Sequence, residues 1–334
     1  MNKNLKKIFG AAMGMTMAFS MTFTFASFAE EASTEAEASV VLPESGDEAF
    51  TIGVSQRATD AAYSIAVLQQ NIDYAKENFP NLEFIETDGQ GDAARQSQNV
   101  EDLIADGVDL ILISPLTSDG LTDAVQAALD AGIPVVSLDR NVECEVTAFI
   151  GADNKSMGVM AADKLAEMMG GKGNIIQCCG TSGASATIDR QSGFEEELEK
   201  YPDMKIVDSQ DCDYSTADAA AYIEDMLQKY GEGEIQAIYC HNDPMAEGVC
   251  ETLKAAGRDQ EGILVCGMDG EDAAFKLVDD GEMAFSIIYP TNAPEGIETA
   301  YAILTGADYE SELHPVPTIV DASNVAEYLG TGLQ

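Results

Sequence analysis

From about residue 50 onward, short apolar stretches alternate with longer stretches of helical length, and this alternation limits the possible folds more than any other feature of the chain. Segments 108–114 and 133–140 are short, apolar and rich in β-branched residues, as buried parallel strands are. Segment 118–131 lies between them and has the length and polarity of a surface helix. Repeated strand–helix alternation predicts an α/β fold, in which parallel sheets are flanked by helices on both faces.

The alternation restarts after residue 154 and supplies more strands than one sheet comfortably holds. Two similar lobes of roughly 130 residues each agree better with the usual size of a domain. Between residues 154 and 330 no segment has the composition of a flexible linker. We therefore expect two lobes joined by several tight crossings of the chain.

The first 29 residues have the pattern of a signal peptide. Three lysines among the first seven residues precede an apolar stretch at 8–25, and small residues stand at Ser27 and Ala29, the positions that a signal peptidase reads. We expect cleavage after Ala29, which makes residues 1–29 the signal peptide. The alternative is an uncleaved membrane anchor, although the apolar run is near the lower limit for spanning a bilayer.

Residues 30–48 consist mainly of Glu, Ala, Ser and Thr, which predicts a disordered acidic tether. No cysteine precedes Cys144, so we expect no lipid anchor on an N-terminal cysteine. The expected location is outside the cytoplasmic membrane, in the periplasm or on the outer face of the cell envelope.

The formal net charge of −42 restricts the partners. Such a negative field repels phosphate backbones and anionic lipids, so we expect neither nucleic acid nor a membrane surface as a partner. Most of the acidic side chains are expected to form a solvated surface.

The cysteines and histidines predict neither a metal site nor a cofactor. The seven cysteines lie mostly in apolar runs, Cys178 and Cys179 side by side, which favours free buried thiols. One disulfide, for example with Cys212, stays open as an alternative. The cysteines have no paired spacing such as C-x-x-C, and His241 and His314 are the only histidines.

Polar or aromatic side chains follow several predicted strands. These residues are Asp139, Arg140, Arg190, His241, Asn242, Asp243, Asp269 and Tyr289. Because ligands bind at the carboxyl ends of strands in open α/β sheets, we expect these groups to converge on one cleft. A single such residue is more often a turn residue or a helix N-cap, as Asn242 or Asp243 would be, but the recurrence favours a site.

Asp139 and Arg140 indicate what kind of ligand this cleft would hold. A carboxylate accepts hydroxyl hydrogen bonds and a guanidinium donates several, so the pair suits a small polyhydroxy ligand that is neutral overall. An ordinary ion pair facing solvent is the alternative.

Three tyrosines add aromatic faces at the same places in the pattern. Tyr63 begins the first helix, Tyr214 follows a turn after a strand, and Tyr289 ends a strand. Sugar rings pack their C–H faces on aromatic planes while their hydroxyls bind Asp, Asn and Arg. The alternative for Tyr63 and Tyr214 is a half-buried position at a helix start. The glycine-rich loop at 180–185 lacks the Gly-Lys-Ser/Thr ending of a phosphate-binding loop.

Five motifs carry a resemblance to a known family. They are IPVVSLDR at 133–140, ADN at 152–154, GTSGASATIDRQSGF at 180–194, HNDPM at 241–245 and GMDG at 267–270. In their order and spacing, the sequence resembles the type I periplasmic sugar-binding proteins of bacterial ABC transporters, in particular the ribose- and galactofuranose-binding group. The resemblance runs from about residue 50 to the C-terminus.

This resemblance implies two Rossmann-like lobes with a three-crossing hinge and a monosaccharide clamped between them. The N-terminal lobe would comprise 49–152 plus 290–316, and the C-terminal lobe 153–289 plus 317–334. The implied ligand-binding residues are Tyr63, Ser64, Asp139, Arg140, Asn154, Arg190, Tyr214, Asn242, Asp269 and Tyr289. Two of them depart from the pattern: Tyr289 stands where ribose binders carry a glutamine, and Ser64 where a second aromatic residue or an arginine is usual.

The implied function is that of a monomeric, non-enzymatic solute-binding protein that delivers a pentose or hexose, in pyranose or furanose form, to a transporter permease. A sugar sensor for a chemoreceptor or sensor kinase would present the same closed surface and stays open. An exported glycosidase would need two carboxylates on opposite sides of a glycosidic bond, for which Asp139 and Asp269 are candidates.

Overall fold

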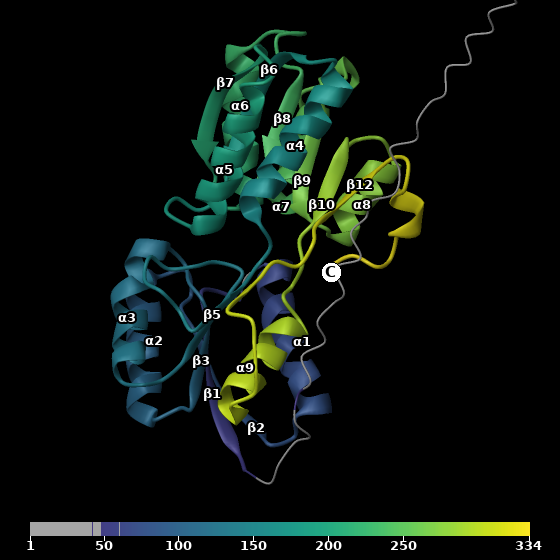
Figure 1. The fold of residues 1–334 in the computed structure, drawn as a ribbon. Helices are drawn as coiled ribbons and strands as arrows, with labels where there is room; N and C mark the ends of the chain where they lie inside the picture. The colour runs from purple at the N-terminus through teal and green to yellow at the C-terminus, as the bar shows by residue number, and fades with distance from the viewer. Residues whose placement is uncertain (1–41, 43–47, 60) are drawn as a thin grey trace, which may run out of the picture. The chain divides into compact units, whose positions relative to one another are not determined.

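Two six-stranded sheets form the framework of the protein (Figure 1). The structure, a computed structural model, describes residue 42, residues 48–59 and residues 61–334. The expected signal peptide and most of the expected tether lie outside the described residues.

The first sheet has the strand order β11-β5-β4-β3-β1-β2, and all its neighbouring strands are parallel. Its strands are β1 (Phe50–Gln56), β2 (Leu82–Asp88), β3 (Leu110–Ser114), β4 (Val135–Leu138), β5 (Ala148–Ile150) and β11 (Glu312–Leu313). Its helices are α1 (Ala62–Asn78), α2 (Ala93–Asp106), α3 (Ser118–Asp130) and α9 (Glu295–Thr305).

Each face of this sheet has its own core, because successive strand residues point to opposite sides. In β3, Leu110 and Leu112 belong to the core that α1 and α9 cover, whereas Ile111 and Ile113 belong to the core under α2 and α3. The two helix pairs lie on opposite sides of the strands in Figure 1. The run of apolar residues at 110–113 is therefore what a strand buried on both faces requires.

The second sheet has the order β12-β10-β9-β8-β6-β7, in which only β12 is antiparallel to its neighbour. Its strands are β6 (Lys172–Cys179), β7 (Asp203–Asp211), β8 (Ala237–Cys240), β9 (Leu264–Asp269), β10 (Phe285–Ile288) and β12 (Thr318–Asp321). Its helices are α4 (Asn154–Met169), α5 (Ser185–Leu198), α6 (Thr216–Lys229), α7 (Asp243–Ala255) and α8 (Asp272–Asp279). Two short 3-10 helices occur at Asp259–Glu261 and Val325–Glu327.

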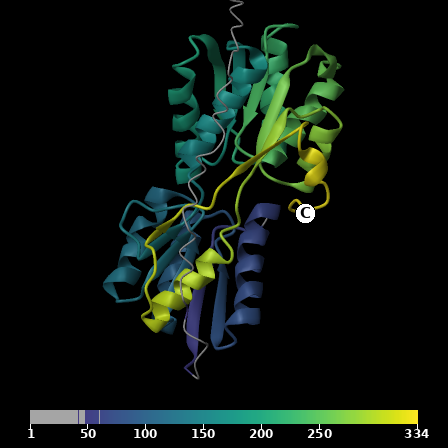
Figure 2. The same ribbon diagram turned by 45° about the vertical axis from the view of Figure 1, so that its right-hand side comes forward.

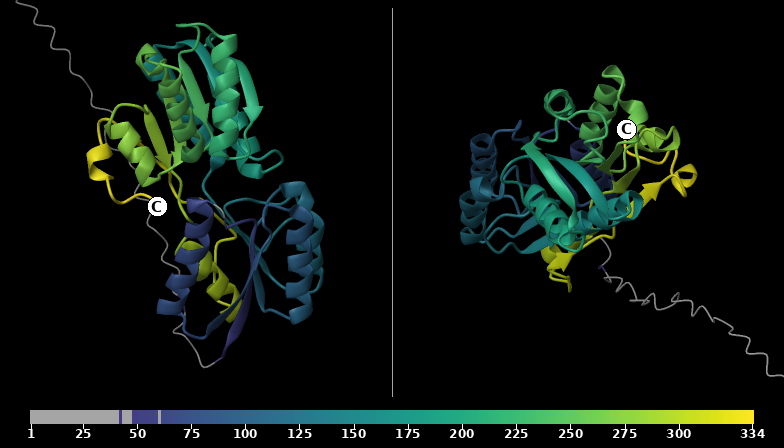
Figure 3. Two further views of the ribbon diagram at one scale, coloured as in Figure 1. Left: turned by 180° about the vertical axis from the view of Figure 1, so that it is seen from behind. Right: turned by 90° about the horizontal axis from the view of Figure 1, so that it is seen from above.

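Each face of the second sheet also has its own core. Ile175 packs in the core that α4 and α5 cover, and Ile176 packs in the core under α6, α7 and α8. Figure 3 shows these helix layers from behind and from above.

The chain changes sheets three times, after β5, after β10 and after β11 (Figure 2). The predicted α/β fold with two parallel-sheet units and a three-crossing hinge is thereby confirmed. Strand β11 was not predicted, because two residues carry no recognisable periodicity. The predicted strand at 133–140 is shorter in the structure: β4 ends at Leu138, and Asp139 turns the chain with a φ of 68°.

Helices α4 and α5 pack unusually close, and glycines make this possible. A Cβ atom on Gly158 would collide with the backbone oxygen of Arg190, and one on Gly193 with the backbone oxygen of Lys155. The close contact fixes the middle of α5, which carries Arg190, against the first turns of α4. Two small residues thus position a charged side chain that the functional site uses.

All seven cysteines are free, as predicted, and six of them are buried. Burial raises the pKa of Cys179 to about 11. The disulfide with Cys212, kept open above, does not form in this structure. Across residues 48–59 and 61–334 we find no cluster of side chains suited to a metal ion. The helices described there also include none with the length and apolar character of a membrane span.

Candidate functional site

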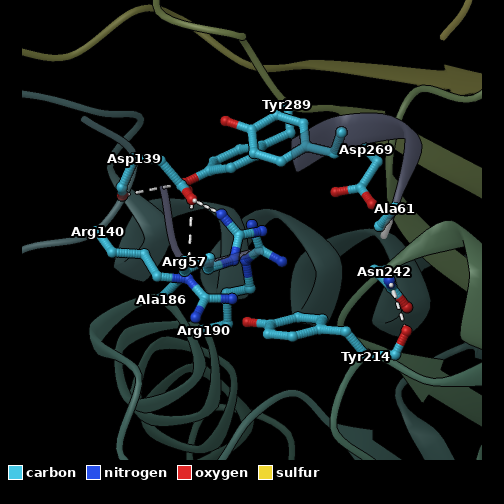
Figure 4. A pocket seen from close by; sticks show the side chains of 11 residues that line it. Arg57, Ala61, Asp139, Arg140, Ala186, Arg190, Tyr214, Asn242, Asp269 and Tyr289 are labelled. Carbon is cyan, nitrogen blue, oxygen red and sulfur yellow. Dashed lines mark hydrogen bonds and ion pairs between the residues drawn. The ribbon is translucent and has the colours of Figure 1, made fainter. Parts of the chain in front are cut away.

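A pocket lies where the strand ends of both sheets meet (Figure 4). It encloses about 340 Å³ of empty space, part of it open to solvent. Its lining residues are Arg57, Ala61, Tyr63, Asp139, Arg140, Ala186, Arg190, Tyr214, Asn242, Asp269 and Tyr289. Eight of the ten residues named from the sequence are among them, whereas Ser64 and Asn154 are not.

The fold brings these residues together because most of them follow a strand or lie near the start of a helix, and Arg190 lies in the second turn of α5. Arg57 follows β1, Asp139 follows β4, Asp269 ends β9 and Tyr289 follows β10. Carboxyl ends of parallel strands share one edge of a sheet, so both sheets deliver polar groups to the same gap.

Asp139 is the most heavily bonded acid of the pocket, and it is 2% exposed. The hydroxyl of Tyr289 donates to its Oδ1 at 2.6 Å, and Nη1 of Arg57 donates to its Oδ2 at 3.2 Å. Nε of Arg140 lies 3.7 Å from the same Oδ2. Two arginines therefore share one carboxylate, which compensates part of their buried charge.

Tyr289 connects this acid to the other sheet. Its hydroxyl accepts a hydrogen bond from Nδ2 of Asn154 at 3.0 Å. Its ring lies 4.9 Å from the ring of Tyr63, centroid to centroid, and the guanidinium of Arg190 lies 4.5 Å from its centroid. Asn154 also accepts from Nε of Arg190 at 2.8 Å, so it holds two lining residues from behind the pocket.

Tyr214 forms the opposite aromatic wall, with the Arg140 guanidinium 5.2 Å from its ring centroid. Its backbone has a φ of 58°. Its ring packs on the backbone of Gly180, where a Cβ atom would collide with it. Gly180 therefore leaves the space that the ring of Tyr214 occupies.

Asn242 and Tyr63 have structural partners as well as a place in the pocket. Asn242 caps α7, since its Oδ1 accepts from the backbone nitrogen of Met245 at 3.0 Å, and its Nδ2 donates to the backbone oxygen of Tyr214 at 3.3 Å. The Tyr63 hydroxyl donates to the backbone oxygen of Pro290 at 2.9 Å. Tyr63 is thus a buried helix-start residue whose ring also lines the pocket.

Asp269 is the exception among these groups, because its carboxylate accepts no hydrogen bond from the described residues and forms no ion pair with them. It is 7% exposed and points into the pocket (Figure 4). Burial, and then the neighbouring Asp243, raises the pKa of Asp269 well above its usual range. A buried carboxylate without a donor is unstable unless something else supplies hydrogen bonds.

The pocket concentrates positive charge in a very acidic protein. The chain has five arginines, at positions 57, 95, 140, 190 and 258, and three of them line this one pocket. They face two lining carboxylates, Asp139 and Asp269. Fixed donors, two acids and aromatic faces suit a small ring that carries several hydroxyls.

Residues 52–308 match the family model described as a periplasmic binding protein domain. This chain belongs to the periplasmic binding protein family. The binding protein is 34% identical over 239 residues to a ribose import binding protein of Bacillus subtilis, which covers 71% of this chain and 75% of that protein. It is 31% identical over 245 residues to a galactofuranose-binding protein of Escherichia coli, covering 71% of this chain and 76% of the relative.

Solved structures agree with this family membership. A fructose-binding periplasmic domain of a hybrid two-component system has a TM-score of 0.80 and 30% identity, over 84% of this chain and 93% of that one. A galactofuranose binding protein also has a TM-score of 0.80, with 28% identity over 85% and 98% of the two chains. The resemblance stated from the sequence motifs is confirmed.

Three residues that line the pocket of the binding protein were not predicted from the sequence: Arg57, Ala61 and Ala186. Arg57 directly follows β1, so the rule that selected the other strand-end residues would also have selected it. The two alanines carry no polar signal and are found only from their position. Ser64, by contrast, is buried and its backbone oxygen accepts from Nε2 of Gln56 at 2.6 Å.

Proposed function

We propose that this periplasmic binding protein captures a monosaccharide between its two lobes and delivers it to the permease of an ABC transporter. The ligand would be a pentose or a hexose, in pyranose or furanose form. The observation that carries the proposal is Asp269, a buried carboxylate that faces a pocket lined from both sheets and finds no donor among the described residues. Sugar hydroxyls supply such donors.

The lining residues would have different roles in binding the sugar. Asp139 and Asp269 accept hydroxyl hydrogen bonds, while Arg140 and Arg190 donate to sugar oxygens in a cleft with little water. Tyr63, Tyr214 and Tyr289 surround the ring, and Asn242 contributes its amide. The contacts of Asn154 favour a positioning role for it, and Ser64 lies outside the lining set.

Binding would close the lobes because the ligand touches both. A sugar held by residues of both sheets binds the closed form better than the open form, so it shifts the hinge equilibrium toward closure. The lobes in this proposal are 49–152 plus 290–316 and 153–289 plus 317–334. We place the protein outside the cytoplasmic membrane as a monomer, with residues 1–29 as its signal peptide.

A sensor role is the second candidate, and the likeness to the fructose-binding domain of a hybrid two-component system supports it. Both roles depend on the same closed form. Deleting the gene would abolish uptake of the sugar if the protein serves a transporter, and would abolish only the sugar-induced response if it serves a sensor.

The experiment that tests the proposal is a thermal-shift screen of the mature chain against pentoses and hexoses, including sugars that populate furanose forms. A ligand at one hundred times its Kd adds about 2.7 kcal/mol to the free energy of unfolding. At least one monosaccharide is expected to raise the Tm, and chromatography is expected to recover it unchanged. No shift across the panel, or turnover of a glycoside, would contradict the proposal.

A further inference from the structure

Arg57 occupies the centre of the lining in Figure 4, between residues of the two sheets. Its side chain is 11% exposed and leaves the chain directly after β1. Strand β1 is a central strand of the first sheet, beside β3. Its end therefore lies next to Ser114, which ends β3, and both partners of the Arg57 guanidinium come from this row of strand ends.

The bonding of Arg57 leaves donors unused. Its Nη1 donates to Oγ of Ser114 at 3.1 Å and to Oδ2 of Asp139 at 3.2 Å. Neither its Nε nor its Nη2 donates a hydrogen bond to any of the described residues. A guanidinium has five N–H donors, so most of them remain for a molecule in the pocket. These donors are open to a molecule that enters the pocket.

The guanidinium of Arg140 also has donors without a partner. Its Nη1 donates to the backbone oxygen of Leu116 at 2.8 Å, while its buried Nε has no hydrogen-bond partner. Burial, and then the nearby charge of Arg57, lowers the pKa of Arg140. An electron-rich oxygen in the pocket near both guanidinium groups would accept hydrogen bonds from their N–H groups that face the pocket, and would reduce the mutual repulsion of the two charges.

We propose that Arg57 is a ligand-binding residue that, with Arg140, forms a two-arginine site for one oxygen of the ligand and thereby sets sugar specificity. This inference rests on the proposed function. The shared chemistry is an oxygen acceptor, which a neutral sugar supplies as a hydroxyl or ring oxygen and a sugar acid supplies as a carboxylate. Asp139 fixes the two guanidinium groups at this end of the pocket.

The test is isothermal titration of the wild type, Arg57→Gln and Arg57→Lys with the best ligand of a panel. The panel contains D-ribose, L-arabinose, D-galactose and D-fructose, with D-ribonate and D-galacturonate as the acid arm. Arg57→Gln is expected to weaken binding about tenfold or more, as expected for a lost charged hydrogen bond. Arg57→Lys is expected to recover only part of the loss, because an ammonium lacks the planar fork.

Deoxy analogues of the bound sugar separate direct contact from a structural effect. One deoxy analogue should bind the wild type more weakly than its parent sugar, and should lose nothing further relative to the parent in Arg57→Gln. The matched control is Arg95→Gln, an exposed arginine on α2 that bonds to Gln90, and it should bind as the wild type does.

Each outcome decides something. Wild-type affinity in Arg57→Gln rejects the inference and leaves the proposed function standing. If Arg57→Gln weakens binding while the penalty of every deoxy analogue is unchanged, Arg57 contacts the ring oxygen or a carboxylate and not a hydroxyl. If the wild type binds no member of the panel, both are rejected. Tighter binding of an acid than of every neutral sugar identifies the oxygen as a carboxylate, and the reverse identifies it as a hydroxyl or ring oxygen.

Discussion

At the scale of single residues, most polar groups of the pocket form hydrogen bonds within the protein, and a few do not. Asp139 has donors on both oxygens, from Tyr289 and Arg57. Asp269 has none among the described residues. The first acid is held in place by the protein, and the second depends on what enters the pocket.

We therefore expect Asp269 to lower the stability of the ligand-free protein and to increase its affinity for sugar. Because burial raises its pKa, ionising this acid in the folded protein is unfavourable, and Asp269→Asn removes that penalty. We expect the variant to have a higher Tm without ligand at pH 8 and to bind sugar at least tenfold more weakly. Thermal denaturation and titration calorimetry measure the two effects. A lower Tm with unchanged affinity would show that Asp269 has a structural role only.

We expect Gly180 to be essential for sugar binding, because it allows the ring of Tyr214 to take its place in the pocket wall. A Cβ atom at this position collides with the tyrosine ring, so Gly180→Ala must displace an aromatic wall of the pocket. We expect a tenfold or greater loss of affinity, on the order of the 1.4 kcal/mol that one decade requires. Gly231→Ala is the matched control, because the nearest atom there is the flexible tip of Glu234. Equal affinity in the two variants would mean that Tyr214 contributes little.

At the scale of elements, the junction of α7 and α8 gathers acids. Asp243 begins α7 and is fully buried, with bonds from the backbone nitrogens of Gly270 and Glu271 and from Ser286. Glu247 lies one turn further along α7, and Glu271 precedes α8. Burial, and then Asp243, raises the pKa of Glu247 to about 7 and that of Glu271 to about 7.

This junction predicts a pH dependence of stability. A carboxyl whose folded pKa exceeds its unfolded value of 4.5 binds protons more tightly in the folded state, so its penalty is absent below about pH 4.5 and grows as the pH rises toward 7. Glu247→Gln should thus stabilise the protein at pH 8 by about 1–2 kcal/mol, after allowance for partial solvent exposure, and change little at pH 5.

Chemical denaturation at the two pH values measures this effect. The exposed Glu77 on α1 supplies the control, as Glu77→Gln should leave the pH dependence unchanged. Equal stabilisation by Glu247→Gln at pH 5 and pH 8 would contradict the prediction.

The sequence predicted the elements far better than the contacts between them. Segment 118–131, predicted as a helix, forms α3 at Ser118–Asp130, within one residue of the prediction. Strand-end positions likewise identified Asp139, Asn242 and Asp269 as pocket residues. Periodicity and strand position are local properties, so one sequence is enough to read them.

Contacts across the molecule could not be predicted in this way. The bond from Tyr289 to Asp139 joins residues 150 positions apart, and nothing local to either residue indicates it. The same holds for Asn154, which lies behind the pocket because its amide is taken by Tyr289 and Arg190. Arg57 differs, since its place after β1 was a usable signal.

At the scale of the whole molecule, three crossings and one shared pocket predict a hinge that responds to ligand. A sugar that contacts both lobes should lower the radius of gyration in small-angle X-ray scattering, because it favours closure. Saturating the protein with its best ligand should produce this decrease, and a sugar that does not bind should not. An unchanged radius of gyration at saturation would mean that binding does not move the lobes.

If residues of both sheets hold one sugar at the same time, a substitution on either side of the pocket should weaken its binding. Titration calorimetry of two variants with the same sugar tests this most directly. Asp139→Ala removes a contact of the first sheet, and Arg190→Ala removes a contact of α5 beside the second sheet. We predict one site per chain in the wild type and a tenfold or greater loss of affinity in each variant, about 1.5–3 kcal/mol. Near wild-type affinity in either variant would contradict it.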